Sequence, residues 1–209
     1  RDAQESRGLG DVYKRQLIIT SSDLETSLSS KILIESTINV KIAVPAKLLI
    51  DILKSLPDQP LTFIKSDQNV IEISANSGKY SLAYFDGEEF PKPIQVKDPV
   101  KTKISGNLVG KAIDSTLFAS GNDDLRPVMS GIFFQFSSES LTFVATDAHK
   151  LVRYTRYDLK SDETGEFIMP KKPLQILKNS LSLIDEEITI EYNQTNAQYC
   201  FGNSTLTCR

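Results

Sequence analysis

The sequence predicts an α+β fold in which one module, made of antiparallel strands with amphipathic helices packed on one side, occurs twice. Two long repeats lead to this prediction. The segment LIITSSDLETSL at 17–28 returns 124 residues later as LTFVATDAHKLV at 141–152, and each contains Ser/Thr-Asp after a β-like run. The helical segment opened by Val44-Pro45 returns as the one opened by Met169-Pro170. Repeats this long indicate duplicated domains, because solenoid units recur every 20–50 residues.

In the first module, strands are expected where β-branched residues alternate with polar ones. These strands are Leu17–Thr20, Ser30–Val40, Leu61–Ile64, Val70–Ser74 and Tyr80–Ala83. Pro45 suits the first turn of a helix that Pro57 ends. The expected buried stripe of this helix is Leu48, Leu49, Ile52, Leu53 and Leu56. Lys47, Asp51 and Lys54 fall on the opposite side of the helix.

The acidic, proline-rich segment Asp86–Pro99 is expected to connect the modules. The second module then begins with a helix that has Ser105 as N-cap. Its buried stripe is Leu108, Val109, Ala112, Ile113, Thr116 and Leu117, and its polar side carries Asn107, Lys111 and Asp114. After a polar loop at Gly121–Pro127, a second helix is expected at Pro170–Leu181, with Leu174, Leu177 and Leu181 buried. The strands are Ile132–Phe136, Leu141–Ala145, Leu151–Tyr157, Ile188–Tyr192, Gln198–Phe201 and Thr205–Cys208.

The offset of the repeat relates Lys47 to Lys171 and Lys54 to Lys178. Both helices therefore have one apolar side and one lysine-bearing side. Such helices are expected to pack on a sheet and to present the lysines to a polar partner. A solvated helix face is the alternative explanation of the same pattern.

Composition limits the possible functions. The 209 residues carry a net charge of −3, which is not typical of a protein that coats DNA with its whole surface but is compatible with one basic face. No apolar run reaches the roughly 18–20 residues that span a bilayer, and no signal segment is recognised. Cys200 and Cys208 could face each other or point apart. One histidine and two cysteines do not make a four-ligand zinc site, so no metal or cofactor is expected.

The sequence contains no Walker-type phosphate loop, no GxGxxG and no GxSxG. Asp123-Asp124 could belong to a two-metal site, but no third carboxylate on a rigid strand accompanies it. His149 has no Ser or Cys partner in a recognised motif. Nothing in the sequence indicates a catalytic residue.

The motif LRPVMSGIFF followed by ATDAHKLV resembles the middle domain of the bacterial sliding clamp family, the beta subunit of DNA polymerase III. VPAKLLIDILKSLPDQPLTF and ANSGKYSL resemble the end of that family's first domain. The resemblance implies that 17–100 is the C-terminal part of clamp domain 1 with a linker. It implies that 101–209 is domain 2 with a truncated end, and that domain 3 is absent. Residues 1–16 resemble a non-native or adaptor-like scar and are expected to lie outside the fold.

The family resemblance implies a non-catalytic, cytoplasmic subunit of a DNA-directed DNA polymerase, which forms a homodimeric ring around duplex DNA. Helices would line the hole and antiparallel sheets the rim. The implied partners are double-stranded DNA, bound without sequence preference, the polymerase III alpha subunit, the clamp loader and other proteins with a clamp-binding motif. No membrane partner is implied.

The resemblance also assigns residues to two sites. The hole-lining cations would be Lys47, Lys54, Lys111, Arg126, Lys171, Lys172 and Lys178. The wall of a pocket for partner peptides would be Met129, Thr146, Ala148, His149, Lys150 and Leu151. Ala148 stands where the family usually has Gly, and Lys150 where it has Arg. The alternatives are a metal-dependent nucleotidyltransferase or phosphotransferase and a non-catalytic β-rich interaction module. A carboxylate–metal cluster would favour the first alternative, and exposed apolar helices without lysines would favour the second.

Overall fold

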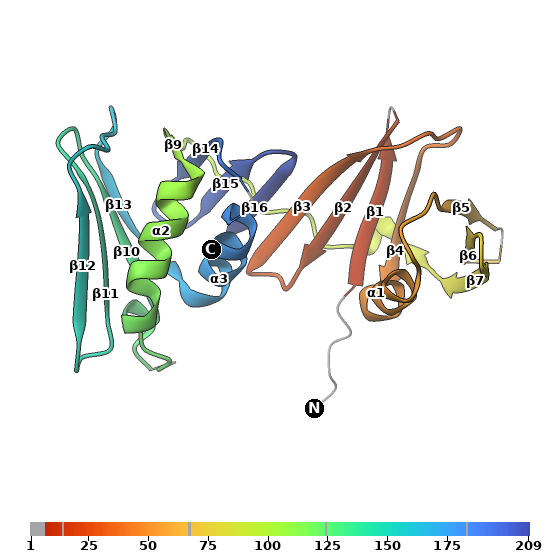
Figure 1. The fold of residues 1–209 in the computed structure, drawn as a ribbon, viewed down its shortest axis with the longest axis horizontal. Helices are drawn as coiled ribbons and strands as arrows, with labels where there is room; N and C mark the ends of the chain where they lie inside the picture. Colours follow the sequence, from red (N-terminus) through yellow and green to blue (C-terminus); the bar gives the residue numbers. More distant parts are fainter. Residues whose placement is uncertain (1–6, 14, 67, 124, 183) are drawn as a thin grey trace. The chain divides into compact units, whose positions relative to one another are not determined.

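The computed structural model describes residues 7–13, 15–66, 68–123, 125–182 and 184–209. The chain divides into two compact units, Arg1–Pro93 and Ile94–Arg209. The boundary lies inside the predicted connection Asp86–Pro99. In Figure 1 the first unit runs from red to yellow and the second from green to blue.

The described residues of unit 1 form two groups of antiparallel strands and one α-helix. Its strands are β1 (Arg7–Tyr13), β2 (Gln16–Ser22), β3 (Thr26–Leu33), β4 (Val40–Pro45), β5 (Thr62–Lys65), β6 (Val70–Ala75), β7 (Gly78–Ala83) and β8 (Phe85–Asp86). Helix α1 spans Ala46–Ser55, and a 3₁₀ turn spans Gly87–Glu89. The strands are hydrogen-bonded in the orders β8-β4-β1-β2-β3 and β5-β6-β7.

In the described part of unit 2, two α-helices accompany two groups of antiparallel strands. Its helices are α2 (Gly106–Thr116) and α3 (Lys171–Leu181), with 3₁₀ turns η2 (Leu117–Ala119) and η3 (Pro127–Met129). Its strands are β9 (Val100–Ser105), β10 (Gly131–Phe136), β11 (Leu141–Thr146), β12 (Leu151–Arg156), β13 (Gly165–Pro170), β14 (Glu187–Tyr192), β15 (Ala197–Phe201) and β16 (Ser204–Cys208). They pair in the orders β12-β11-β10-β13 and β16-β15-β14-β9.

The predicted repeat is visible in the strand orders. The sequence β4-β1-β2-β3 in unit 1 corresponds to β13-β10-β11-β12 in unit 2, α1 corresponds to α3, and β5–β7 correspond to β14–β16. Unit 2 also has β9, which pairs with β14, and α2, which packs beside α3. Among the described residues, unit 1 has no counterpart of β9 or α2.

For the helices, the offset between the two copies of the repeat is 125 residues rather than the predicted 124. Gly8 of β1 and Ile132 of β10 are equivalent and lie 124 residues apart. Their strand partners, Val44 and Met169, lie 125 residues apart, so unit 2 has one additional residue before β13. The N-cap residues Pro45 and Pro170 are accordingly equivalent. Lys47 then corresponds to Lys172 rather than Lys171, and Lys54 corresponds to Asn179 rather than Lys178. The equivalence expected from a constant offset was therefore wrong, because unit 2 has one more residue than unit 1 between β12 and β13, and α3 follows β13 directly.

The expectation that residues 1–16 lie outside the fold is wrong for the described part of this segment. β1 lies inside the unit 1 sheet, hydrogen-bonded to β2 on one side and to β4 on the other. Leu9 is buried with Ala43 and Phe90. The segment shows no apolar alternation, but a strand with two hydrogen-bonded neighbours is held chiefly by its backbone. Residues 1–6 and 14 lie outside the described residues.

Two predicted helices are confirmed in unit 2, and their predicted apolar stripes are buried except for Leu108, which is half-buried. Val109, Ala112 and Ile113 of α2 and Leu174 and Leu177 of α3 are fully buried. Both helices pack on the sheet β12-β11-β10-β13 (Figure 1). Ser105 is the N-cap of α2, but its side chain makes no capping hydrogen bond; instead, the backbone N–H of Gly106 donates to Glu186 O at 2.9 Å.

The predicted burial of α1 is only partly correct. Leu49, Ile52 and Leu56 are half-buried, whereas Leu48 and Leu53 are exposed. No residue of α1 is fully buried. The reason is that no described helix of unit 1 covers the side that α2 covers on α3.

Two further expectations are refined by the strand pairing. The strand predicted at Ser30–Val40 is two strands, β3 and β4, separated by a loop. In the β15–β16 hairpin, Cys200 lies opposite Thr205 and Cys208 lies opposite Ala197. The two cysteines therefore do not face each other, and both are free thiols.

Candidate functional site

The polar sides of α2 and α3 form a shallow groove in unit 2. The groove has a volume of about 240 Å³ and is lined by Asn107, Gly110, Lys111, Asp114, Lys178, Leu181 and Ser182. Lys111, Asn107 and Asp114 are exposed, as predicted, because the opposite side of α2 is buried in the core. The groove thus combines two ammonium groups with one carboxylate on neighbouring helices.

One ion pair crosses the groove. Lys178 Nζ of α3 donates to Asp114 Oδ1 of α2, and the two side chains keep 42% and 65% of their surface exposed. At the other end of the groove, Asn107 Nδ2 donates to Asp185 Oδ1 at 3.3 Å. Lys178 is therefore held toward α2 rather than extended into solvent.

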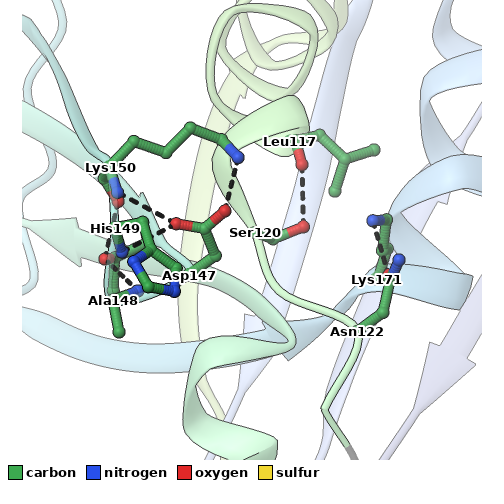
Figure 2. Close-up of polar contacts among 9 residues, drawn as sticks. Leu117, Ser120, Asn122, Asp147, Ala148, His149, Lys150 and Lys171 are labelled. Carbon is green, nitrogen blue, oxygen red and sulfur yellow. Dashed lines mark hydrogen bonds and ion pairs between the residues drawn. The ribbon is translucent and has the colours of Figure 1, made fainter.

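Two other predicted cations of unit 2 also contact neighbouring side chains. Lys171 Nζ donates to Asn122 Oδ1 at 2.8 Å (Figure 2). Arg126 Nε donates to Asp123 Oδ2 at 2.7 Å. This bond, with a hydrogen bond from the backbone N–H of Leu125, lowers the pKa of Asp123. The polar loop after α2 therefore lies against the start of α3 and carries its own ion pair.

The remaining predicted cations are exposed on their helices. Lys172 lies beside Lys171 at the start of α3. Lys47 and Lys54 of α1 are exposed, with Asp51 on the same side of the helix. The structure therefore brings Lys111 and Lys178 together in unit 2 and places Lys47 and Lys54 on one helix of unit 1.

The residues predicted for a peptide pocket occupy the turn between β11 and β12 and the nearby turn η3. Asp147 organises the first of these turns. Its Oδ1 accepts from the backbone N–H groups of His149 at 3.0 Å and Lys150 at 2.9 Å, and its Oδ2 pairs with Lys150 Nζ (Figure 2). The ammonium of Lys150 and these two N–H groups lower the pKa of Asp147. Both oxygens of the Asp147 carboxylate therefore stabilise this turn.

Thr146 has the same structural role in this turn. Its Oγ1 accepts from Ala148 N at 3.1 Å and donates to Lys150 O at 2.8 Å. Ala148 has φ +73°, in the left-handed region that favours glycine. Unit 1 contains the same turn, in which Asp23 accepts from Glu25 N and Thr26 N, and Leu24 has φ +76°. The Ser/Thr-Asp of the sequence repeat is therefore a turn motif.

Apolar side chains are exposed near this turn. Leu151 is 66% exposed, and Val128 of η3 is 65% exposed. Met129 is half-buried. Gly121 lies between the turn η3 and the β11–β12 turn. Its N–H donates to Met129 O at 2.8 Å, and a Cβ added to Gly121 would lie 3.7 Å from Asp147 Cβ. Val128 and Leu125, which is 91% exposed, were not predicted as site residues, although their apolar character in a polar loop could have identified them.

Neither a metal-binding cluster nor a membrane-spanning helix is found among the described residues. No group of three or more His, Cys, Asp or Glu that could hold a metal ion occurs in the described part of the chain. Asp123 is paired with Arg126, and Asp124 lies outside the described residues. None of the helices in the described ranges is long and apolar enough to cross a membrane.

Both units match known family descriptions. Residues 9–94 match "DNA polymerase III beta subunit, N-terminal domain", and residues 103–209 match "DNA polymerase III beta subunit, central domain". Similar curated proteins include the beta sliding clamp of Pseudomonas aeruginosa, 28% identical over 200 residues, and that of Synechococcus elongatus, 25% identical over 203 residues. Each alignment covers 95% of this chain and 54% of the relative. The chain therefore spans about half the length of these relatives.

Solved structures agree in fold. A crystal structure of the sliding clamp of Pseudomonas aeruginosa bound to griselimycin has a TM-score of 0.91 and 27% identity, covering 100% of this chain and 58% of that one. The sliding clamp of Bacillus subtilis, at 22% identity, has a TM-score of 0.89 over 97% of this chain and 56% of that one.

Proposed function

Because the chain belongs to the DNA polymerase III beta subunit family, we propose that its two units are parts of a DNA sliding clamp. In the full-length protein, a third domain and a second copy would complete a ring around duplex DNA. The clamp would tether the replicative polymerase and thereby increase its processivity. It would perform no chemical step itself, and it would act in the cytoplasm.

The lysine-bearing sides of α2 and α3 carry the DNA-binding part of this proposal. Lys111, Lys171, Lys172 and Lys178 all lie on this pair of helices, which bury their opposite sides in the unit 2 core. Flexible ammonium groups suit phosphate contacts, which position a duplex without reading its sequence. Lys47 and Lys54 would extend the same chemistry in unit 1, and Arg126 would contribute from the loop after α2.

The overall charge is consistent with sliding. A protein with a net charge of −3 cannot coat DNA with its whole surface. A ring needs only a weak, sequence-independent field along its hole, because closure around the duplex retains it. The cationic helices would supply that field while the rest of the surface remains neutral or acidic.

The exposed apolar residues around the β11–β12 turn support a second binding site. Leu151 and Val128 are exposed, and Met129 lies half-buried nearby. Together with Thr146, Ala148, His149 and Lys150, they would form one wall of a pocket for short hydrophobic peptides. The partners would be the polymerase III alpha subunit, the clamp loader and other proteins with a clamp-binding motif. Apolar anchors usually dominate such binding.

The DNA proposal is tested with this chain and a labelled linear duplex at low salt, by fluorescence anisotropy. The Lys171→Glu, Lys178→Glu double variant should bind at least tenfold more weakly at about 50 mM salt. The slope of log affinity against log salt should become shallower by about 0.9 for each phosphate that the variant no longer neutralises. Arg153→Glu with Lys160→Glu gives the same change in net charge at exposed positions outside α2 and α3. Equal weakening by both pairs would contradict the proposal.

The peptide proposal is tested in the full-length protein with a labelled polymerase-tail peptide. Leu151→Ala should weaken binding at least tenfold, in the range expected for a central anchor of about 2 kcal/mol, and it should leave folding intact because the side chain is exposed. Tyr157→Ala removes a side chain that is 73% exposed outside the proposed pocket. Unchanged affinity of the Leu151 variant would place the pocket elsewhere.

A further inference from the structure

The cations of unit 2 that we assign to the DNA face are mostly bound to groups of the protein itself. Lys178 pairs with Asp114, Arg126 pairs with Asp123, and Lys171 donates to Asn122. The Asp114–Lys178 pair differs from the other two because it crosses between the two helices and lies in the groove. It places a negative charge on the face where phosphates would bind.

We propose that Asp114 is an internal counterion that competes with DNA phosphate for Lys178 and so keeps the affinity of this face low. The inference rests on the proposed DNA-binding function of α2 and α3. Asp114 contacts no DNA in this scheme; it acts through Lys178. A phosphate that approaches Lys178 competes with this existing ion pair, and the neighbouring carboxylate repels the phosphate.

Helix stability does not explain an aspartate at this position. Asp114 lies in the last turn of α2, where the negative end of the helix dipole makes a negative side chain unfavourable. Its carboxylate pairs with Lys178 across the groove, and both side chains are substantially exposed. Exposed ion pairs of this kind contribute little to folding. The carboxylate therefore has a larger effect on the local field than on stability.

The groove around the pair contains the donors that a phosphate would need. Lys111 precedes Asp114 by three residues and so neighbours it on the surface of α2. Asn107, Lys178 and Ser182 complete the polar lining. Asp185, held by Asn107, is a further carboxylate at the other end of the groove. Replacing Asp114 by the isosteric Asn would leave the shape of the groove and remove the competing charge.

Low affinity is physically useful for a clamp that slides. Each phosphate that is neutralised releases counterions and strengthens binding steeply at low salt. A cation already paired within the protein gains less from a phosphate, because it exchanges one anionic partner for another. Asp114 would therefore reduce the number of effective phosphate contacts by about one without removing the lysine.

The test measures binding of this chain to a labelled linear duplex across about 25–150 mM salt. Asp114→Asn should tighten binding three- to tenfold at about 50 mM salt and steepen the salt slope by about 0.9. Glu166→Gln is the matched control. It makes the same change of charge on β13, where Glu166 pairs with the exposed Gln135 rather than with a helix.

A double-variant cycle separates competition for Lys178 from a general loss of negative charge. In the Lys178→Gln background, Asp114→Asn should lose most of its effect. An equal gain in that background, or a gain no larger than that of Glu166→Gln, would overturn the inference. If the Lys171→Glu, Lys178→Glu variant bound DNA as tightly as the unchanged chain, the proposed function would fail first. If that variant lost binding while Asp114→Asn changed nothing, only the role of Asp114 would fail.

Discussion

Ile52 and Leu177 occupy equivalent positions, seven residues after the N-cap prolines of α1 and α3, yet only Leu177 is fully buried. Ile52 is half-buried. The difference follows from their neighbours, because α2 packs beside α3 whereas no described helix of unit 1 packs beside α1. Similar helix sequences therefore contribute differently to the stability of their units.

The first prediction compares truncations at this pair. Leu177→Ala should destabilise unit 2 by about 3 kcal/mol, because a fully buried leucine leaves a cavity in a close-packed core. Ile52→Ala should cost unit 1 roughly 1 kcal/mol, since its surroundings are already open to water. Urea unfolding followed by circular dichroism measures both values. Equal costs would contradict the difference in burial between Ile52 and Leu177.

The second prediction concerns the two left-handed turn residues. Ala148→Gly and Leu24→Gly should each stabilise the protein by about 0.5–1 kcal/mol. A non-glycine residue pays a steric cost of roughly 1–2 kcal/mol in the left-handed region. Glycine removes this cost, which is larger than the loss of backbone entropy that glycine adds on folding. The hydrogen bonds that Asp147 and Asp23 accept should persist in these variants. Their donors are backbone N–H groups, which the substitutions leave in place.

Ala83→Gly is the control for these turn variants. Ala83 is an exposed residue of β7 without positive φ, so glycine should cost about 0.5–1 kcal/mol there. Denaturant midpoints of the three variants give the comparison. Destabilisation at residue 148 as well as 83 would show that the turn does not hold its left-handed geometry in solution.

The predicted α+β fold of repeated sliding-clamp domains is confirmed, and the helices were its most predictable elements. Periodicity located α2 and α3 because one side of each is fully buried. It overestimated the burial of α1, since a sequence pattern does not reveal whether a covering helix is present. It missed β1, whose polar sequence is held by backbone pairing to β2 and β4. A constant offset also misaligned the helices, because insertions between elements leave no mark on periodicity.

The candidate site was predictable in its residue types but not in its contacts. The polar side of α2 identified Lys111 and Asp114 as exposed. The partner of Asp114 lies 64 positions away along the chain, on α3, and only the packing of the two helices brings it near. The predicted Thr146 proved to support a turn through its hydroxyl. Sequence patterns report which side of an element is polar, whereas pairing across elements depends on the tertiary fold.

The last prediction concerns alkaline pH. Cys208 is 2% exposed, and burial raises the pKa of its thiol to about 12. Burial likewise raises the pKa of Tyr199, whose hydroxyl has no hydrogen-bond partner among the described atoms. Both groups are neutral when protonated, so the folded state holds these protons more tightly than the unfolded state. The resulting stability is complete below the unfolded thiol pKa of about 8.5 and is lost as the pH rises toward the folded values.

The melting temperature of unit 2 should therefore be nearly constant between about pH 6 and 8 and should fall above about pH 8.5. At about pH 10 the Cys208 contribution amounts to roughly 2 kcal/mol, and Cys208→Ala should remove that part of the decline. Cys200→Ala, which deletes a half-buried thiol on the same hairpin, is the control. Thermal unfolding in the presence of a reductant gives the curves. Parallel pH profiles for the unchanged chain and the Cys208 variant would show that this thiol is accessible to solvent in the folded state, because an accessible thiol titrates with the same pKa before and after unfolding.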